Sequence, residues 1–152
     1  MINAIDRAAQ ADVRHTTCGM SVIGVAWSPI RAGKLGDGEY SIVFSVEGPP
    51  FFDVIQGPAG SPWDATEGSR FDHIGYWAKD LETDKQELAA RGAPLEFDSC
   101  PYGRSFTYHR LDSIGARVEL VDLAAQVGFR ATWARTTATM PTLDLDGPIT
   151  KL

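Results

Sequence analysis

The most regular pattern of hydrophobic and polar positions lies between residues 71 and 122. Residues 71–77 (FDHIGYW) combine aromatic and polar side chains in a way typical of a strand. Asp80 then provides the cap of a helix over residues 81–91, and Gly92 provides its left-handed stop. The apolar side of this helix consists of Leu81, Leu88 and Ala89. Three strand-like runs follow, at residues 94–97, 105–110 and 116–121. The second half of the chain therefore predicts a βαβββ module.

The first half of the chain repeats this plan. When Gly24 is set against Gly92, an offset of 92 − 24 = 68, a helix is predicted over residues 12–23. The run around Asp53 matches the run around Glu119 at a similar offset, 119 − 53 = 66. Strands are predicted at residues 27–31, 40–46 and 51–56, with a hairpin turn at 33–38 (GKLGDG). A repeat of this length indicates duplication of one supersecondary unit.

These patterns divide the chain into four segments. Residues 1–58 form a first βαβββ module, which is degenerate at its N-terminus because residues 1–10 are too short and too rich in alanine for a clear strand. A turn-rich linker follows at 59–70, and the second module occupies 71–122. Residues 123–152 are predicted to form an amphipathic helix, ending at about residue 133, and a tail. The predicted fold class is α+β.

The composition narrows the range of functions. A net charge of −6 and a pI of about 4.9, with 14 dispersed Lys and Arg residues, argue against a nucleic-acid surface. No apolar run approaches the length of a membrane span, and residues 1–10 lack the pattern of a signal peptide. Cys18 and Cys100 have neither zinc-site nor disulfide spacing, which favours reduced thiols and a cytoplasmic location.

Two segments of the chain carry a resemblance to a known family. They are residues 73–122 (HIGYWAKDLETDKQELAARGAPLEF through GRSFTYHRLDSIGARVELVD) and residues 46–64 (VEGPPFFDVIQGPAGSPWD). Both segments resemble sequences of the vicinal oxygen chelate superfamily, whose members have the glyoxalase/bleomycin-resistance architecture. The resemblance implies two tandem modules that form a half-open, barrel-like cleft. It leaves the activity open, because this superfamily includes lyases, epimerases, extradiol dioxygenases, thiol transferases and non-catalytic drug-binding proteins.

The resemblance also implies a divalent metal site. In such proteins the ligands come from the first and last strands of each module, and the matching positions here are His73, Glu119 and Asp53. The offset of 68 places the fourth position at 73 − 68 = 5, which is Ile5 and not a usual ligand. The sequence therefore departs from the family pattern at one ligand.

The residues themselves leave several roles open. Glu119 lies on an alternating strand and faces either the cleft, where it would be a general base, or solvent. Asp53 has the same geometry, so that the two carboxylates are also a candidate proton-transfer pair. His73 is a candidate metal ligand, a base, or a buried hydrogen-bonded histidine. Tyr108 and His109, the further catalytic candidates, point to opposite faces of one strand, so one of them should enter the cleft. Trp63 and Trp77 are candidates for pocket lining or plain core.

The leading hypothesis is a glyoxalase-like lyase or isomerase that moves a proton next to a carbonyl in a small-molecule substrate. Glu119 would be its base, and His73 a metal ligand or an electrophilic donor. The first alternative is a non-catalytic protein that binds a small molecule or antibiotic, as in bleomycin resistance. A second alternative is a dimerisation scaffold. Exposed sheet edges favour a homodimer, and neither nucleic acid nor membrane is expected as a partner.

Overall fold

The structure of the protein is a computed structural model that describes residues 2–5, 25–45 and 50–133. The strands of the first half are β1 (Ile2–Ile5), β2 (Arg31–Leu35), β3 (Gly38–Phe44) and β4 (Phe52–Gln56). The second half contains β5 (Arg70–Ala78), α2 (Leu81–Ala90), β6 (Leu95–Asp98), β7 (Phe106–Leu111) and β8 (Ala116–Asp122). A 3-10 turn, η1 (Cys100–Tyr102), connects β6 to β7, and a second one, η2 (Leu123–Ala125), leads into the helix α3 (Gln126–Trp133).

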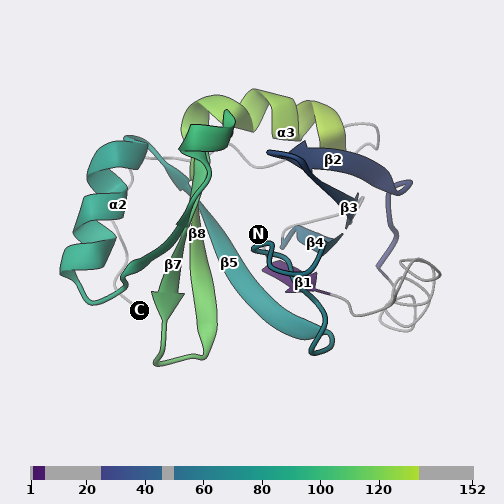
Figure 1. Cartoon of the computed structure of the whole chain (residues 1–152). Coiled ribbons are helices and arrows are strands. Elements are labelled where there is room, and N and C mark those ends of the chain that lie inside the picture. The colour runs from purple at the N-terminus through teal and green to yellow at the C-terminus, as the bar shows by residue number, and fades with distance from the viewer. Residues whose placement is uncertain (1, 6–24, 46–49, 134–152) are drawn as a thin grey trace.

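The eight strands of the described residues form one sheet, in the order β2-β3-β4-β1-β5-β8-β7-β6. In each half the first strand lies parallel to the last, β1 beside β4 and β5 beside β8. β1 and β5 pair in antiparallel orientation and join the two halves, so the strand order of one half mirrors that of the other. Figure 1 shows the two groups of strands, with α2 outside the second group and α3 crossing above both. The predicted α+β fold is confirmed.

The second half follows the sequence prediction closely. The side chain of Asp80 accepts a hydrogen bond from the backbone N–H of Thr83 at 3.0 Å and so caps α2. Gly92 adopts a φ of 91° after the end of the helix, a conformation that favours glycine. The predicted apolar stripe is weaker than expected, because no residue of α2 is fully buried and Ala89 is exposed. The helix therefore lies at the edge of the fold.

In the first half of the chain, the structure differs from three of the predictions made from the sequence. Residues 2–5 do form a strand, because β4 and β5 supply its hydrogen-bonding partners from both sides. The strand expected at 27–31 is wrong: β2 begins at Arg31, and Trp27 makes only an isolated bridge to Ser45. The hairpin turn is also narrower than predicted, since it contains only residues 36 and 37. The helix expected over residues 12–23 lies outside the described residues.

Gly33 was assigned to the turn but lies inside β2, opposite Tyr40 on β3. A Cβ atom at this position would lie 2.3 Å from the Cζ atom of Tyr40. The glycine is therefore required by the close approach of an aromatic ring, which is a different reason from the one that a turn would supply.

The core lies between the two halves of the sheet and includes part of the segment predicted as a linker. Ile55, Trp63, Ala65 and Tyr108 form one buried cluster, and Trp63 is only 3% exposed. The 3-10 turn η2 and the helix α3 lie where the sequence predicts the C-terminal helix. Phe129 of α3 packs against Phe44. The division into segments at residues 58, 70 and 122 stays a prediction. In the described part of the chain, no helix has the length and apolar character needed to cross a membrane.

Replacing Asp80 with Ala should lower the free energy of unfolding by about 1 kcal/mol, because the N–H of Thr83 loses its capping partner. Urea denaturation followed by circular dichroism measures this change. The control is Glu87→Ala, which removes an exposed ion pair with Arg91 on the same helix and should cost less than about 0.5 kcal/mol. Equal effects of the two substitutions would contradict the capping role.

Candidate functional site

A cavity of about 640 Å³ lies between the two halves of the sheet. Strands β2, β3 and β4 line one side, strands β7 and β8 line the other, and η2 and α3 contribute the residues that close one end. Most of its wall is aromatic or aliphatic, and the polar exceptions include two carboxylates and two arginines. Its lining includes Tyr40, Asp53, Trp63, Tyr108, Glu119 and Phe129.

The two carboxylates reach this cavity from equivalent positions. Asp53 lies on β4 opposite Asn3 of β1, and Glu119 lies on β8 opposite Gly75 of β5. Both side chains are buried, with 5% and 7% of their surface exposed. The mirrored strand order therefore directs one carboxylate from each half into the same space, as the pattern match between Asp53 and Glu119 predicted.

His73 lies between two carboxylates and is fully buried. Its Nδ1 is 2.9 Å from Oδ2 of Asp72, and its Nε2 is 3.3 Å from Oε2 of Glu119. Burial alone would lower the pKa of His73. The negative charge of Glu119 and the hydrogen bond to Asp72 outweigh this effect, and the charge of Asp53 adds to them, so the pKa rises to about 9. His73 is therefore an imidazolium at neutral pH.

The pKa of Asp53 is raised as well, which favours the neutral form of this carboxyl group. Burial raises its pKa to about 7, the positive charge of His73 opposes the rise, and the negative charge of Glu119 supports it. A carboxyl group with this pKa holds its proton for a substantial part of the time at neutral pH. The cavity thus contains an acid and a second carboxylate whose surroundings differ.

The donor atoms at the site show whether the metal that the resemblance implies would fit there. Asp53 Oδ1, His73 Nε2 and Glu119 Oε2 are buried, and none has a hydrogen-bond partner of good geometry. These are the donor types that divalent cations bind, so their chemistry fits a metal. In the part of the chain that the structure describes, however, no three His, Cys, Asp or Glu side chains lie close enough together to form a ligand group. The donors fit a cation, whereas their present spacing is not that of an assembled metal site.

The strand register also revises the fourth ligand position. Asn3 faces Asp53 in the same way that Gly75 faces Glu119, so Asn3 is the counterpart of Gly75. The counterpart of His73, two residues earlier, is then position 1, which lies outside the described residues. Ile5 is therefore not the counterpart of His73. The offset of 68 fails here because the first strands of the two modules differ from the later strands in their spacing.

Of the two remaining catalytic candidates, Tyr108 lines the cavity and His109 faces away from it. The hydroxyl of Tyr108 accepts a hydrogen bond from Nε1 of Trp63 at 2.9 Å, and burial raises the pKa of Tyr108 well above its ordinary value. His109 is buried on the other side of β7, with its Nδ1 3.0 Å from the carbonyl oxygen of Ala93. His109 is thus placed as a hydrogen-bonded core histidine.

The two tryptophan candidates also differ. Trp63 lines the cavity, with its indole 4.5 Å from the ring of Tyr40 between centroids. Trp77 lies behind the cavity wall and contacts Phe129 edge-on at 5.4 Å. Trp63 therefore forms part of the pocket, while Trp77 supports the helix that closes it.

Sequence reasoning missed two charged residues beside the cavity, Asp72 and Arg117. Asp72 bonds His73, and a guanidinium nitrogen of Arg117 makes a short contact with the same carboxylate oxygen. The guanidinium carbon of Arg117 also lies 4.0 Å from the centre of the Tyr108 ring. The only signal in the sequence was the adjacent pair Asp72-His73, which a regular strand would direct to opposite faces.

Comparison with known proteins supports the fold. No protein-family model and no curated protein matches the sequence. Among solved structures, a variant of methylmalonyl-CoA epimerase from Streptomyces coelicolor, in complex with 2-nitronate-propionyl-CoA, is 15% identical with a TM-score of 0.54. The match covers 82% of this chain and 95% of that one. Methylmalonyl-CoA epimerase from Mycobacterium tuberculosis is 12% identical with a TM-score of 0.55, over 84% of this chain and 89% of that one.

A mutant of 4-hydroxymandelate synthase from Streptomyces coelicolor matches with 11% identity and a TM-score of 0.53. This match covers 80% of the chain and 46% of the synthase, so the chain spans less than half of that enzyme. At these identities the likeness shows the fold. The chain has the glyoxalase-like fold that the sequence resemblance implied.

Replacing Glu119 with Gln should lower the pKa of His73 from about 9 toward its ordinary value of 6.5, because the negative charge beside Nε2 is removed. NMR titration of the histidine ring protons measures this shift. The control is Glu39→Gln, which removes a charge from an exposed ion pair with Lys34 and should leave the pKa of His73 unchanged.

The raised pKa of His73 also predicts a pH dependence of stability. Because the folded value lies above 6.5, protonation of His73 stabilises the fold fully below pH 6.5, and this contribution is lost as the pH rises toward about 9. The free energy of unfolding of the His73→Gln variant should therefore depend less on pH in this window. A pH dependence equal to that of the parent protein would contradict the assignment.

Proposed function

We propose that the chain is an isomerase or lyase that moves a proton on the carbon next to a carbonyl group of a small molecule. The observation that carries this proposal is the burial of Asp53 and Glu119, from equivalent strands, in one cavity. Two carboxyl groups on opposite sides of a substrate are suited to remove a proton on one face and return one on the other.

The roles of the residues follow from their surroundings. Glu119 is the base, since its Oε2 is buried at the cavity without a hydrogen-bond donor of good geometry. Asp53, with its raised pKa, is the group that holds and returns a proton. The imidazolium of His73 pairs with Glu119 before the reaction, and its positive charge stabilises the negative charge that moves from Glu119 to the substrate oxygen when the proton is taken. Tyr108 and Trp63 form the wall that excludes water from these groups.

The size and lining of the cavity define the substrate class in outline. About 640 Å³ suits a small organic molecule, and the aromatic wall suits an apolar or flat portion of it. The structural likeness to an epimerase solved with a coenzyme A thioester analogue supports an isomerase with a carbonyl or thioester substrate. Arg31 and Arg104 at the cavity are suited to hold an acidic group of that substrate.

The proposal includes a divalent cation, because the donor atoms of three side chains at the site are of the types that such a cation binds. His73, Asp53 and Glu119 would hold it, and it would act as a Lewis acid on the substrate carbonyl. The proton on His73 Nε2 must leave before this nitrogen becomes a ligand.

The aromatic wall of the cavity favours a second candidate, a protein that binds a small molecule without converting it. A planar hydrophobic ligand between Tyr40, Trp63 and Phe129 would use the wall and leave the carboxylates as hydrogen-bond acceptors. A homodimer, a cytoplasmic location and the absence of nucleic-acid and membrane partners remain predictions from the sequence.

Replacing Glu119 with Gln should reduce the exchange of substrate C–H bonds with solvent by about a hundredfold or more, because the base is lost. The measurement is proton NMR in deuterated water with a panel of 2-substituted acyl thioesters and 2-oxo acids. The control is Glu87→Gln on α2, whose exposed side chain pairs with Arg91. Tight binding of panel members without any exchange in the parent protein would favour the binding protein.

The metal content of the protein distinguishes a mechanism that uses a divalent cation from one that uses only the side chains of the site. If a cation is used, protein purified without chelators should contain about one divalent ion per chain, and His73→Ala should remove it. Elemental analysis measures this content, with His109→Gln as the control because His109 faces away from the cavity. Full exchange activity in metal-free protein would instead assign the reaction to the carboxylates and His73 alone.

A further inference from the structure

We propose that Asp72 is a positioning residue, which determines that Nε2 of His73 faces Glu119, and that Arg117 holds Asp72 in the required place. The catalytic consequence of this inference rests on the proposed function. The geometry of His73 that it describes does not depend on which reaction takes place.

The first step is an irregularity in the pairing of β1 with β5. Asn3 pairs with His73, whereas the next residue, Ala4, pairs with Phe71, so Asp72 is an extra residue on β5. A bulge of this kind turns a side chain from the face that it would have in a regular strand. Asp72 and His73 are neighbours in sequence, and both are buried. The bulge thus places the two side chains together on the inner side of the sheet.

The second step is the hydrogen bond between them. Oδ2 of Asp72 lies 2.9 Å from Nδ1 of His73. An ionised carboxylate only accepts hydrogen bonds, so Nδ1 must carry a proton and donate it. This bond fixes the ring so that Nε2 points to Glu119 at 3.3 Å. A carboxylate behind a functional histidine selects the ring nitrogen that acts, whether that nitrogen meets a substrate, a carboxylate or a metal.

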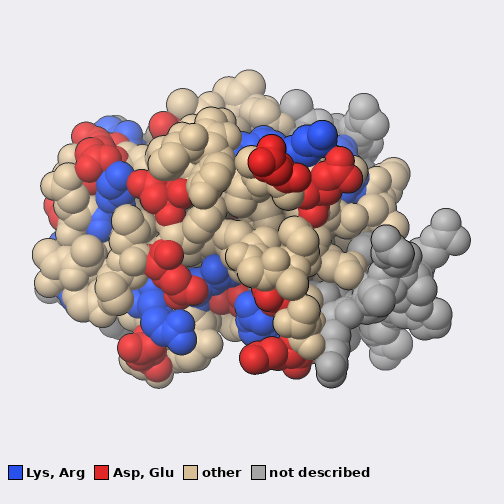
Figure 2. All heavy atoms as spheres, in the orientation of Figure 1, with Lys and Arg blue, Asp and Glu red and all other residues tan. Residues whose placement is uncertain are grey.

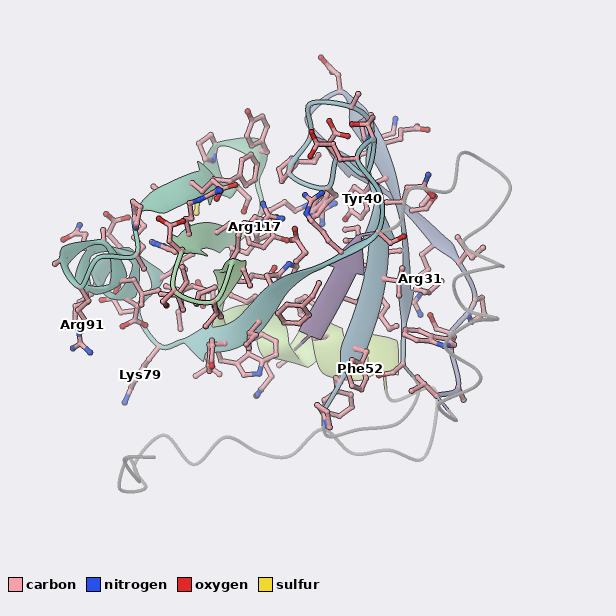
Figure 3. All side chains as sticks on the ribbon, turned by 90° about the horizontal axis from the view of Figure 1, so that it is seen from below. Arg31, Tyr40, Phe52, Lys79, Arg91 and Arg117 are labelled. Carbon is pink, nitrogen blue, oxygen red and sulfur yellow. The ribbon has the colours of Figure 1, made fainter. Side chains whose placement is uncertain are left out.

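The third step is the anchoring of Asp72 itself. Arg117 is largely buried, and it contacts the same oxygen of Asp72 that His73 uses. It also donates a hydrogen bond to the carbonyl oxygen of Pro62 at 2.9 Å and lies over the ring of Tyr108. Figure 3 shows Arg117 in the interior, in contrast to Arg91 and Lys79, whose side chains extend away from the protein. Arg117 therefore fixes Asp72 to both the linker and the cavity wall.

A second arginine supports the arrangement. Nε of Arg70 lies 3.3 Å from the other carboxylate oxygen of Asp72, Oδ1, while Arg117 contacts Oδ2. The carboxylate that meets Nδ1 of His73 is therefore held by cations at both of its oxygens.

The test is proton–nitrogen NMR of protein labelled with ¹⁵N-histidine, combined with the exchange assay. The parent protein should show a protected, hydrogen-bonded Nδ1 proton on His73. Asp72→Ala should abolish this signal and lower the exchange rate by about 10- to 100-fold. Asp72→Glu should restore part of both, and Arg91→Gln, which changes an exposed arginine that pairs with Glu87 on α2, should change neither.

If Asp72→Ala fails to fold, Arg117→Lys serves as the second variant, because it keeps the positive charge but loses the planar stacking and shared hydrogen bonds. A weakened or exchanging Nδ1 proton in this variant supports the proposal. An unchanged Nδ1 signal in either folded variant overturns it, whatever the activity. If the parent protein shows the protected signal but catalyses no exchange, the proposed reaction fails and the positioning of His73 stands.

Discussion

Every charge buried beside the cavity depends on an opposite charge in contact with it. Two carboxylates, Asp72 and Glu119, meet two cations, His73 and Arg117, and the group is nearly closed to solvent. Removing one member would leave an uncompensated buried charge, which costs far more than an exposed ion pair contributes. Asp53 lies outside these pairs and responds by holding a proton more tightly. The protonation states of the site are thus consequences of one balanced set of charges.

The four balanced charges all belong to the second half of the sheet, on β5 and β8, whereas Asp53 belongs to the first half. The pairing of β1 with β5 joins the two halves and so brings Asp53 near the other four residues. The same pairing contains the bulge at Asp72. A single strand pair therefore both joins the two halves that line the cavity and contains the residue that orients His73.

Much of the fold could be predicted from the sequence, because the second half is locally consistent. Asp80 and Gly92 mark the ends of α2, and the runs of strand-forming residues after it follow the order of β6, β7 and β8. The first half was harder, since β1 has little strand character of its own and forms through its two neighbours. Gly33 was misassigned for a related reason: its environment is created by Tyr40 on the next strand.

For the site, the sequence repeat identified Asp53 and Glu119 as equivalent, and the structure places them at one cavity. The family resemblance selected His73, and the strand pattern selected Tyr108. Both residues lie beside the two carboxylates. The roles of Asp72 and Arg117 could not be found in this way. They depend on a bulge and on a contact between residues 117 − 72 = 45 positions apart, and neither has a local sequence signal. His109 was selected because strand alternation cannot decide which face is inner.

The position of β1 in the sheet has a consequence for synthesis of the protein. Ile2 pairs with Phe52 and with Ile74, at separations of 52 − 2 = 50 and 74 − 2 = 72 residues. Contacts between such distant residues form slowly, because a long loop must first be closed. During translation, β1 and β4 therefore leave the ribosome before β5 exists to complete the sheet. A nascent chain that pauses in the segment before β5 exposes an unpaired strand edge, and pairing with another chain at that stage would compete with folding.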